Sequence, residues 1–153
     1  VWSPNSVSMP GTEANAMKNY YPGDMYVDWL GVSCYPPSLS ATYPEERRYP
    51  LTLMQGIKQV SADKPIMISE GGYSSTCDHQ RWVREWFKLK DEEPRVKAVV
   101  WENHENAENG DRRLQSDPLA LELYKELVQD PYWLDLIPDA VYSEIETRKN
   151  NSK

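Results

Sequence analysis

The chain has 153 residues, of which 39 % are hydrophobic and 27 % charged, and its net charge is −7. This is the composition of an ordinary globular protein, and it excludes collagen, low-complexity sequence and a coiled coil. No apolar run reaches the roughly 18 residues that a membrane span needs, and an acidic chain repels the phosphates of nucleic acids. The aromatic residues are 6 Trp, 10 Tyr and 1 Phe, which suits stacking on sugars as well as core packing.

The chain begins at Val1, with neither an initiator methionine nor a signal peptide, and continues directly into an apolar stretch. We therefore expect a segment of a longer protein, with processing after a removed leader as the alternative. Residues 1–138 are expected to form one domain, and the polar tail 139–153 is expected to fray. Two cysteines are too few for a disulfide scaffold, and their spacing is not that of a zinc site.

Four short apolar segments predict β-strands. They are rich in β-branched residues and nearly continuous in hydrophobicity, which favours parallel strands buried on both faces. The predicted strands are 1–4, 26–35, 65–69 and 96–101.

Apolar residues at helical spacing predict helices between these strands and after the last one. The predicted helices are a short one at 12–19 and longer ones at 51–62, 80–90 and 118–129. The last helix follows Asp117, a good capping residue, and has Pro118 at its first position. Residues 21–24 carry a strong turn signal.

Alternating strands and helices indicate repeated βαβ units in a parallel sheet. The predicted strands start about every 32 residues, and eight such units give about 250 residues, the usual size of a (β/α)8 barrel. We therefore expect an α/β fold in which this chain supplies half of a barrel. An open doubly wound sheet is the alternative, but no predicted strand is followed by the glycine-rich phosphate motif of that fold.

Glu70 is the strongest candidate for chemistry, because it follows the third predicted strand directly and barrel enzymes place their sites at such strand ends. Gly71 and Gly72 are expected to let the backbone turn and to leave space beside the carboxylate. A carboxylate fixed on a rigid strand is what a retaining glycosidase needs as its nucleophile. The alternative is a strand-end glutamate in a surface ion pair.

Two aromatic residues end the neighbouring strands. Tyr35 is placed to donate a hydrogen bond to Glu70, which would keep that carboxylate ionised and oriented; a core tyrosine is the alternative. Trp101 is placed to stack under a sugar ring, or else to pack against the next helix.

Other polar residues have weaker claims. Glu102 and Glu105 are further carboxylates at the same rim. His104 and Glu105 resemble an acid/base pair, but their surroundings are typical of a solvated loop. Asp28 lies inside the second predicted strand, where we expect a buried carboxylate with a structural partner.

The segment Cys77, Asp78 and His79 contains residue types that ligate metals. No partner pair appears elsewhere in the sequence, so we expect no metal site. A disulfide between Cys34 and Cys77 is left open, because both lie near the ends of adjacent predicted strands.

Several segments together resemble glycoside hydrolase family 26, the retaining β-mannanases and related β-glycanases. The most specific is Y-Y-P-G-D-M-Y-V-D-W, and the resemblance covers nearly all of the chain up to about residue 130. The matching segments are V-W-S-P-N at 1–5, Y-Y-P-G-D-M-Y-V-D-W-L-G-V-S-C-Y at 20–35, K-P-I-M-I-S-E-G-G at 64–72, V-K-A-V-V-W at 96–101 and D-R-R-L-Q-S at 111–116.

The resemblance implies that the four strands are the fifth to eighth of a (β/α)8 barrel. Glu70 then matches the nucleophile, Tyr35 the residue that positions it, and Trp101 the aromatic residue under the bound sugar. Glu102, which departs from the family pattern, and Tyr73 are the other expected substrate contacts. The family's acid/base glutamate follows a histidine at the fourth strand, which would precede Val1.

The implied reaction is double displacement on β-1,4-mannan or a related β-glycan, without a metal or an organic cofactor. The expected partners are the polysaccharide and the N-terminal half of the barrel, and a polymeric substrate suggests an extracellular enzyme. This chain alone is expected to be inactive and poorly stable. A non-catalytic carbohydrate-binding relative and a structural half-barrel are the rival interpretations.

Overall fold

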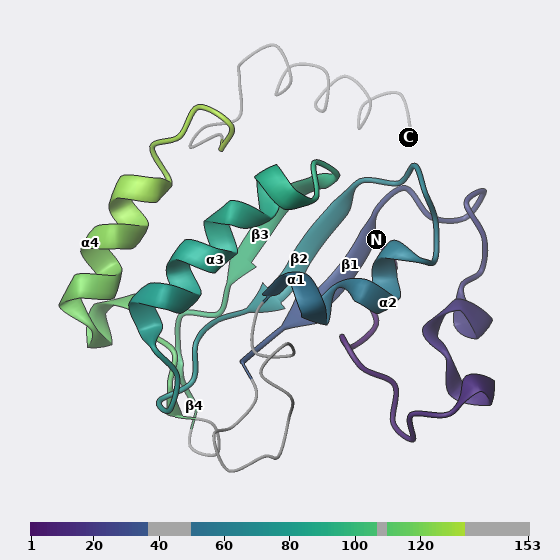
Figure 1. Cartoon of the computed structure of the whole chain (residues 1–153), viewed down its shortest axis with the longest axis horizontal. Helices are drawn as coiled ribbons and strands as arrows, with labels where there is room; N and C mark the ends of the chain where they lie inside the picture. Colours follow the sequence, from purple (N-terminus) through teal and green to yellow (C-terminus); the bar gives the residue numbers. More distant parts are fainter. Residues whose placement is uncertain (37–49, 107–109, 134–153) are drawn as a thin grey trace, which may run out of the picture.

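The structure is a computed structural model, and it describes residues 1–36, 50–106 and 110–133 (Figure 1). The predicted tail at 139–153 lies outside the described residues. Within the described part, no helix is long and apolar enough to cross a membrane.

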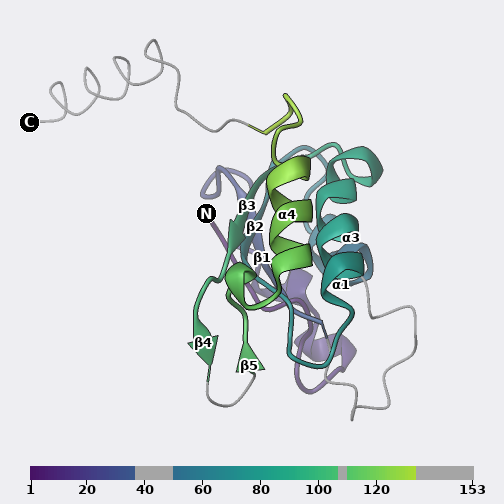
Figure 2. The same ribbon diagram turned by 90° about the vertical axis from the view of Figure 1, so that its left-hand side faces the viewer.

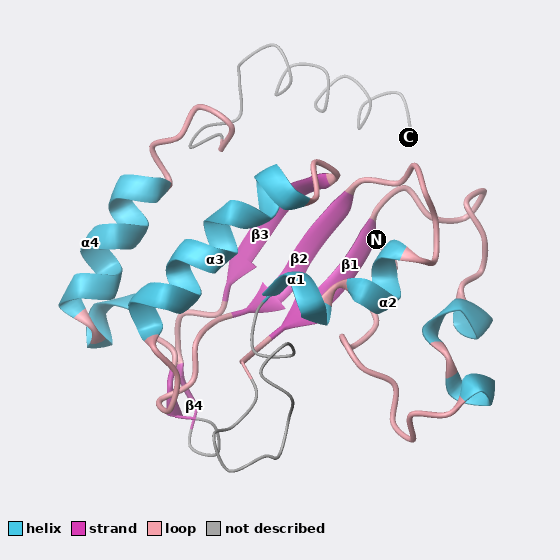
Figure 3. Ribbon diagram, in the orientation of Figure 1, coloured by secondary structure: helices cyan, strands magenta, loops and turns pink. Residues whose placement is uncertain are grey.

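Three parallel strands form the central sheet in the order in which they occur in the chain (Figure 3). They are β1 (Leu30–Cys34), β2 (Ile66–Gly71) and β3 (Val96–Trp101). The N-terminal segment extends this order, because Trp2 and Asn5 form parallel bridges with Leu30 and Ser33. The four predicted segments therefore lie side by side in chain order, although residues 1–4 form no regular strand and the N-terminal segment pairs only through these isolated bridges.

Helices cover one face of this sheet, as the edge-on view in Figure 2 shows. They are α1 (Pro50–Leu53), α2 (Gln55–Lys58), α3 (His79–Glu92) and α4 (Pro118–Leu127). Each of the links from β1 to β2 and from β2 to β3 thus contains helix, and α4 follows β3. The alternation predicted from the sequence is confirmed for these elements.

The core lies between the sheet and the helices. Alternate residues of the strands point toward the helices and are fully buried, among them Leu30, Val32, Ile66 and Ile68. Trp86 of α3 lies at the centre of this layer and is fully buried. Its indole meets the ring of Trp101 edge to face at 5.4 Å.

Two helices begin with aspartate caps. The Asp78 side chain accepts the backbone N–H of Arg81 at the start of α3. Asp117 accepts the N–H groups of Leu119 and Ala120 at the start of α4, as its position before Pro118 predicts.

Some predicted bounds are wrong. The helix predicted at 51–62 is two short helices, α1 and α2, separated at Met54, and Gly56 lowers helix propensity there. The short helix predicted at 12–19 is two 3-10 turns, Glu13–Asn15 and Met17–Tyr20.

The second strand begins at Leu30 rather than at residue 26. Asp28 consequently lies before the strand and is exposed, so the prediction of a buried structural carboxylate is wrong. The disulfide left open above is absent, because Cys34 and Cys77 are both free thiols.

Glu93 ties together the amino ends of the strands. This buried carboxylate accepts from Arg95, which precedes β3, and is paired with Lys58 of α2 at 3.1 Å. Arg95 also donates to the carbonyl of Ser61, between α2 and β2, at 2.6 Å. The hydrogen bonds from Arg95, and then that from Lys58, lower the pKa of Glu93 to about 2.

This lowered pKa predicts an acid-sensitive contribution to stability. The ionised form is favoured in the folded state, so the contribution is complete above the ordinary glutamate pKa of 4.5 and is lost as pH falls toward 2. We expect Glu93→Gln to lower the free energy of unfolding by about 1–3 kcal/mol at pH 7 and to flatten its pH dependence between 4.5 and 2. Denaturation of the intact protein across this pH range measures both effects.

Glu92→Gln is the matched control, because Glu92 is exposed and belongs to the last turn of α3. Equal acid sensitivity of the two variants would contradict the assignment to Glu93.

Candidate functional site

The polar residues predicted to form a site meet at the carboxyl ends of the strands. Tyr35 follows β1, Glu70 lies near the end of β2, and Glu102 follows β3. The backbone N–H of Glu102 donates to the carbonyl of Gly71 at 2.7 Å, which fixes these two strand ends together. The β4–β5 hairpin, Glu105–Asn106 and Gly110–Asp111, extends beyond the same end of the sheet (Figure 1).

Glu70 is exposed and is brought toward β1 by a β-bulge. Val32 pairs with Ile68 but Ser33 pairs with Glu70, so Ser69 is the extra residue of β2. The Ser33 hydroxyl donates to Glu70 Oε2 at 3.3 Å. Sequence reasoning did not identify Ser33, although its place two residues before Tyr35 on the same strand face could have indicated it.

Tyr35 has its hydroxyl buried between two carboxylates. Burial raises the pKa of Tyr35 strongly, and the neighbouring carboxylates of Glu102 and Glu70 raise it further. The phenol therefore keeps its proton at neutral pH and can donate it. The hydroxyl is buried, and no hydrogen bond of regular geometry fixes it to either carboxylate.

Glu102 is held by two basic side chains and is mostly buried. Arg112 Nη1 donates to Glu102 Oε2, and His104 Nδ1 lies 3.1 Å from Glu102 Oε1. Arg112 reaches this position through the hairpin, since its backbone N–H donates to the His104 carbonyl at 3.1 Å. The substrate contact expected of Glu102 stays a prediction, and both of its oxygens already have partners.

Arg112 is the functional candidate that sequence reasoning missed. It is a buried residue, and its guanidinium lies 4.0 Å from the centroid of the Tyr35 ring. It comes from a segment 77 positions after Tyr35, and no local sequence pattern marks such a contact.

Trp101 and Tyr73 pack against the core. The ring of Trp101 contacts those of Tyr73, Trp86 and Tyr124 edge to face at 5.2–5.7 Å. Tyr73 is fully buried, and its hydroxyl donates to the Arg113 carbonyl at 2.6 Å. Trp101 is half-buried, and the substrate contacts expected of Trp101 and Tyr73 stay predictions.

The residues around Cys77 serve the local fold. Asp78 caps α3, and the His79 ring stacks on Tyr73 at 3.8 Å. The two nitrogens of His79 face Asp117 Oδ2 and the Ser74 carbonyl, each at 3.0 Å. Among the described residues, no group of three or more His, Cys, Asp or Glu side chains could hold a metal ion.

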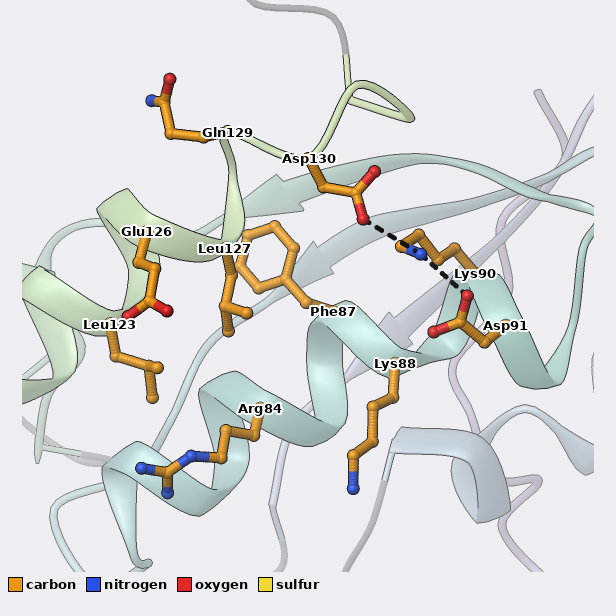
Figure 4. Close-up of a pocket in the computed structure, with 10 residues that line it drawn as sticks. All are labelled: Arg84, Phe87, Lys88, Lys90, Asp91, Leu123, Glu126, Leu127, Gln129 and Asp130. Carbon is orange, nitrogen blue, oxygen red and sulfur yellow. Dashed lines mark hydrogen bonds and ion pairs between the residues drawn. The ribbon is translucent and has the colours of Figure 1, made fainter.

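A groove of about 620 Å³ lies between α3 and α4, within the helix layer (Figure 4). Lys90 spans it with ion pairs to Asp91 and Asp130, at 2.8 and 3.2 Å. The lining residues are Arg84, Phe87, Lys88, Lys90, Asp91, Leu123, Glu126, Leu127, Gln129 and Asp130. None of the predicted site residues lines this groove.

No protein-family model matches the chain. A curated protein, Endoglucanase H of Acetivibrio thermocellus, is 29 % identical over 113 residues. The match covers 71 % of this chain but only 12 % of that protein. The chain is thus related, weakly and in part, to a glycosidase. Membership of family 26 stays a prediction.

Gly71 is required by packing rather than by a turn. A Cβ at this position would collide with the Trp86 indole and with the Cys34 carbonyl. Gly71 and Gly72 are not among the glycines with positive φ, which in the described residues are Gly23 and Gly110. Neither glycine therefore uses the left-handed backbone region, and the expectation that they let the backbone turn beside Glu70 stays a prediction.

This contact predicts that Gly71→Ala is costly. The Trp86 ring is fully buried and cannot move without repacking the core, so we expect a loss of about 1–3 kcal/mol in the free energy of unfolding. Thermal or chemical denaturation of the intact protein measures the change.

Gly72→Ala is the matched control. A Cβ there would meet its nearest atom, the Glu102 carbonyl oxygen, at 3.4 Å, which is ordinary contact. If Gly71→Ala were tolerated as well as Gly72→Ala, the account of this strand end would be wrong.

Proposed function

We propose that this chain carries the nucleophile of a retaining glycosidase, with Glu70 in that role. The observation that carries the proposal is the exposed Glu70 carboxylate at the carboxyl end of β2, with the Ser33 hydroxyl on one oxygen and the protonated Tyr35 phenol beside it. Hydroxyl donors stabilise and orient a carboxylate, while exposure leaves it free to meet a substrate. The weak similarity to Endoglucanase H supports the same class of reaction.

We also propose that the fold is the C-terminal half of a (β/α)8 barrel. Consecutive strands are parallel neighbours in chain order, and the helices lie on one face (Figure 2). A barrel requires both properties, whereas a doubly wound sheet reverses its strand order and carries helices on both faces. In this proposal the strand segments are the fifth to eighth of the barrel, as the family 26 resemblance implies.

In the proposed first step, the Glu70 carboxylate attacks the anomeric carbon of the bound sugar. A covalent glycosyl–Glu70 ester forms, the glycosidic C–O bond breaks, and the leaving oxygen takes a proton from a second carboxyl group. In the second step, water attacks the anomeric carbon, the ester bond breaks, and the proton of the water returns to the second carboxylate. The two carboxyl groups must stand about 5–5.5 Å apart for this mechanism.

Glu102 does not suit the role of the second carboxyl group. Its two oxygens are occupied by Arg112 and His104, so neither is free to deliver a proton to a leaving group. We propose that the acid/base glutamate comes from the N-terminal half of the barrel, as the family 26 resemblance implies.

The proposed substrate is a β-1,4-linked glycan, mannan in the family 26 interpretation. The name of Endoglucanase H makes a glucan the first substrate to compare. A polymeric glycan is met outside the cell, and we propose an extracellular enzyme on that ground alone.

Removal of the Glu70 carboxylate tests this proposal. In the intact protein we expect Glu70→Ala to lower kcat on β-mannan or β-glucan by at least about 10³-fold, because no nucleophile remains. Azide should restore turnover in this variant by attacking the anomeric carbon in place of Glu70, and the product should be a glycosyl azide. Reducing-sugar release and mass spectrometry measure the two effects.

Glu105→Gln is the control, since Glu105 is an exposed carboxylate that is paired with Arg113 at 3.3 Å. Full activity of Glu70→Ala would exclude Glu70 as the nucleophile. An intact protein that binds glycans without hydrolysing them would instead be the non-catalytic relative.

A further inference from the structure

Arg112 is a buried cation beside Tyr35 and Glu102, with no part in the two-step reaction itself. Its side chain is 9 % exposed, and its Nε is buried without a hydrogen bond. Burying a guanidinium removes its charge from water, and this desolvation penalty must be offset by interactions with groups close to it. Here the compensation comes from the Glu102 carboxylate and from the face of the Tyr35 ring, whose centroid lies 4.0 Å from the Arg112 guanidinium carbon.

The Tyr35 hydroxyl has one proton and two carboxylates that could accept it. Both oxygens of Glu102 already have a basic partner: Arg112 pairs with Oε2 and His104 with Oε1. Glu70 accepts a hydrogen bond from the Ser33 hydroxyl on Oε2. Glu70 thus has one side-chain donor among the described residues and Glu102 has a basic partner on each oxygen, so Glu70 keeps the greater capacity to accept from Tyr35.

We propose that Arg112 is a positioning residue that occupies Glu102 and holds the Tyr35 ring, so that the Tyr35 hydroxyl donates to Glu70. This inference rests on the proposed function, because it names the group that keeps the nucleophile oriented. Arg112 acts through Tyr35 and needs no contact with the substrate.

Arginine suits this role better than lysine does. The guanidinium carbon lies over the Tyr35 ring, 4.0 Å from its centroid, while an N–H group of the same planar fork donates to Glu102. An ammonium group is a compact charge and cannot make both contacts with the same geometry. The contacts also join three elements, because Tyr35 follows β1, Glu102 follows β3 and Arg112 follows β5.

A double-mutant cycle in the intact protein tests this inference. We expect Arg112→Lys to lower kcat by about 10- to 100-fold, as small displacements of reacting groups do, with a much smaller change in KM. Tyr35→Phe should lower kcat by a similar factor. The double variant should be no slower than Tyr35→Phe alone, because Arg112 acts through the hydroxyl that this substitution removes. Losses that multiply in the double variant would overturn the inference.

Arg113→Lys is the matched control. Arg113 is the next residue, and its side chain pairs with Asp111 and Glu105 away from Tyr35. We expect its kcat to equal that of the wild type. A loss equal to that of Arg112→Lys would show a general effect on the hairpin and would also overturn the inference.

A spectroscopic cycle separates this inference from the proposed function. The tyrosines would be labelled with ¹³C at Cζ and observed by NMR. Introducing Glu70→Gln into the wild type should change the chemical shift of Tyr35, whereas introducing it into Arg112→Lys should leave that shift unchanged. A response in both backgrounds, or in neither, would overturn the positioning role. The expected response in a protein that hydrolyses no glycan would retain the positioning role and refute the proposed function.

If Arg112→Lys does not fold, the double variant Glu102→Gln/Arg112→Gln replaces it, because it leaves neither buried charge unpaired. In this variant, too, adding Glu70→Gln should leave the NMR signal of Tyr35 unshifted. A shift of that signal would overturn the inference.

Discussion

The close contact between the Gly71 backbone and the Trp86 indole is the constraint on which the rest of the structure depends. It lets α3 approach the end of β2 with its largest side chain fully buried, and Trp101 of β3 packs against the same ring. With the helix side of this strand end filled by Trp86, the bulge at Ser69 brings Glu70 opposite Ser33. The end of β2 thus carries a buried packing contact at Gly71 and the exposed carboxylate at the preceding residue.

The two ends of the sheet have different roles. At the amino ends, Glu93 forms ion pairs with Lys58 of α2 and with Arg95 before β3, and these pairs stabilise the fold. At the carboxyl ends, the Glu70 carboxylate is exposed and can meet a ligand.

The sequence predicted those features that depend on neighbours along the chain. The bounds of β3 and the cap at Asp117 follow from the residues next to them in the sequence. That the strand ends lie together follows because the strands are parallel and adjacent in chain order. Arg112 could not be predicted, because its contacts with Tyr35 and Glu102 depend on how the hairpin folds back. An aromatic residue at a strand end is equally compatible with stacking on a sugar and with packing, and half-buried Trp101, with three ring contacts in the core, remains compatible with both.

Covalent trapping tests the central claim, that Glu70 is a glycosidase nucleophile, most directly. The intact protein would be incubated with 2-deoxy-2-fluoro glycosyl fluorides of the gluco and manno series, which slow the second step so that the ester accumulates. The account predicts one added fluorosugar per chain, located by peptide mass spectrometry on Glu70. A label on a different carboxylate, or turnover of the normal glycan with no covalent adduct at Glu70, would contradict it.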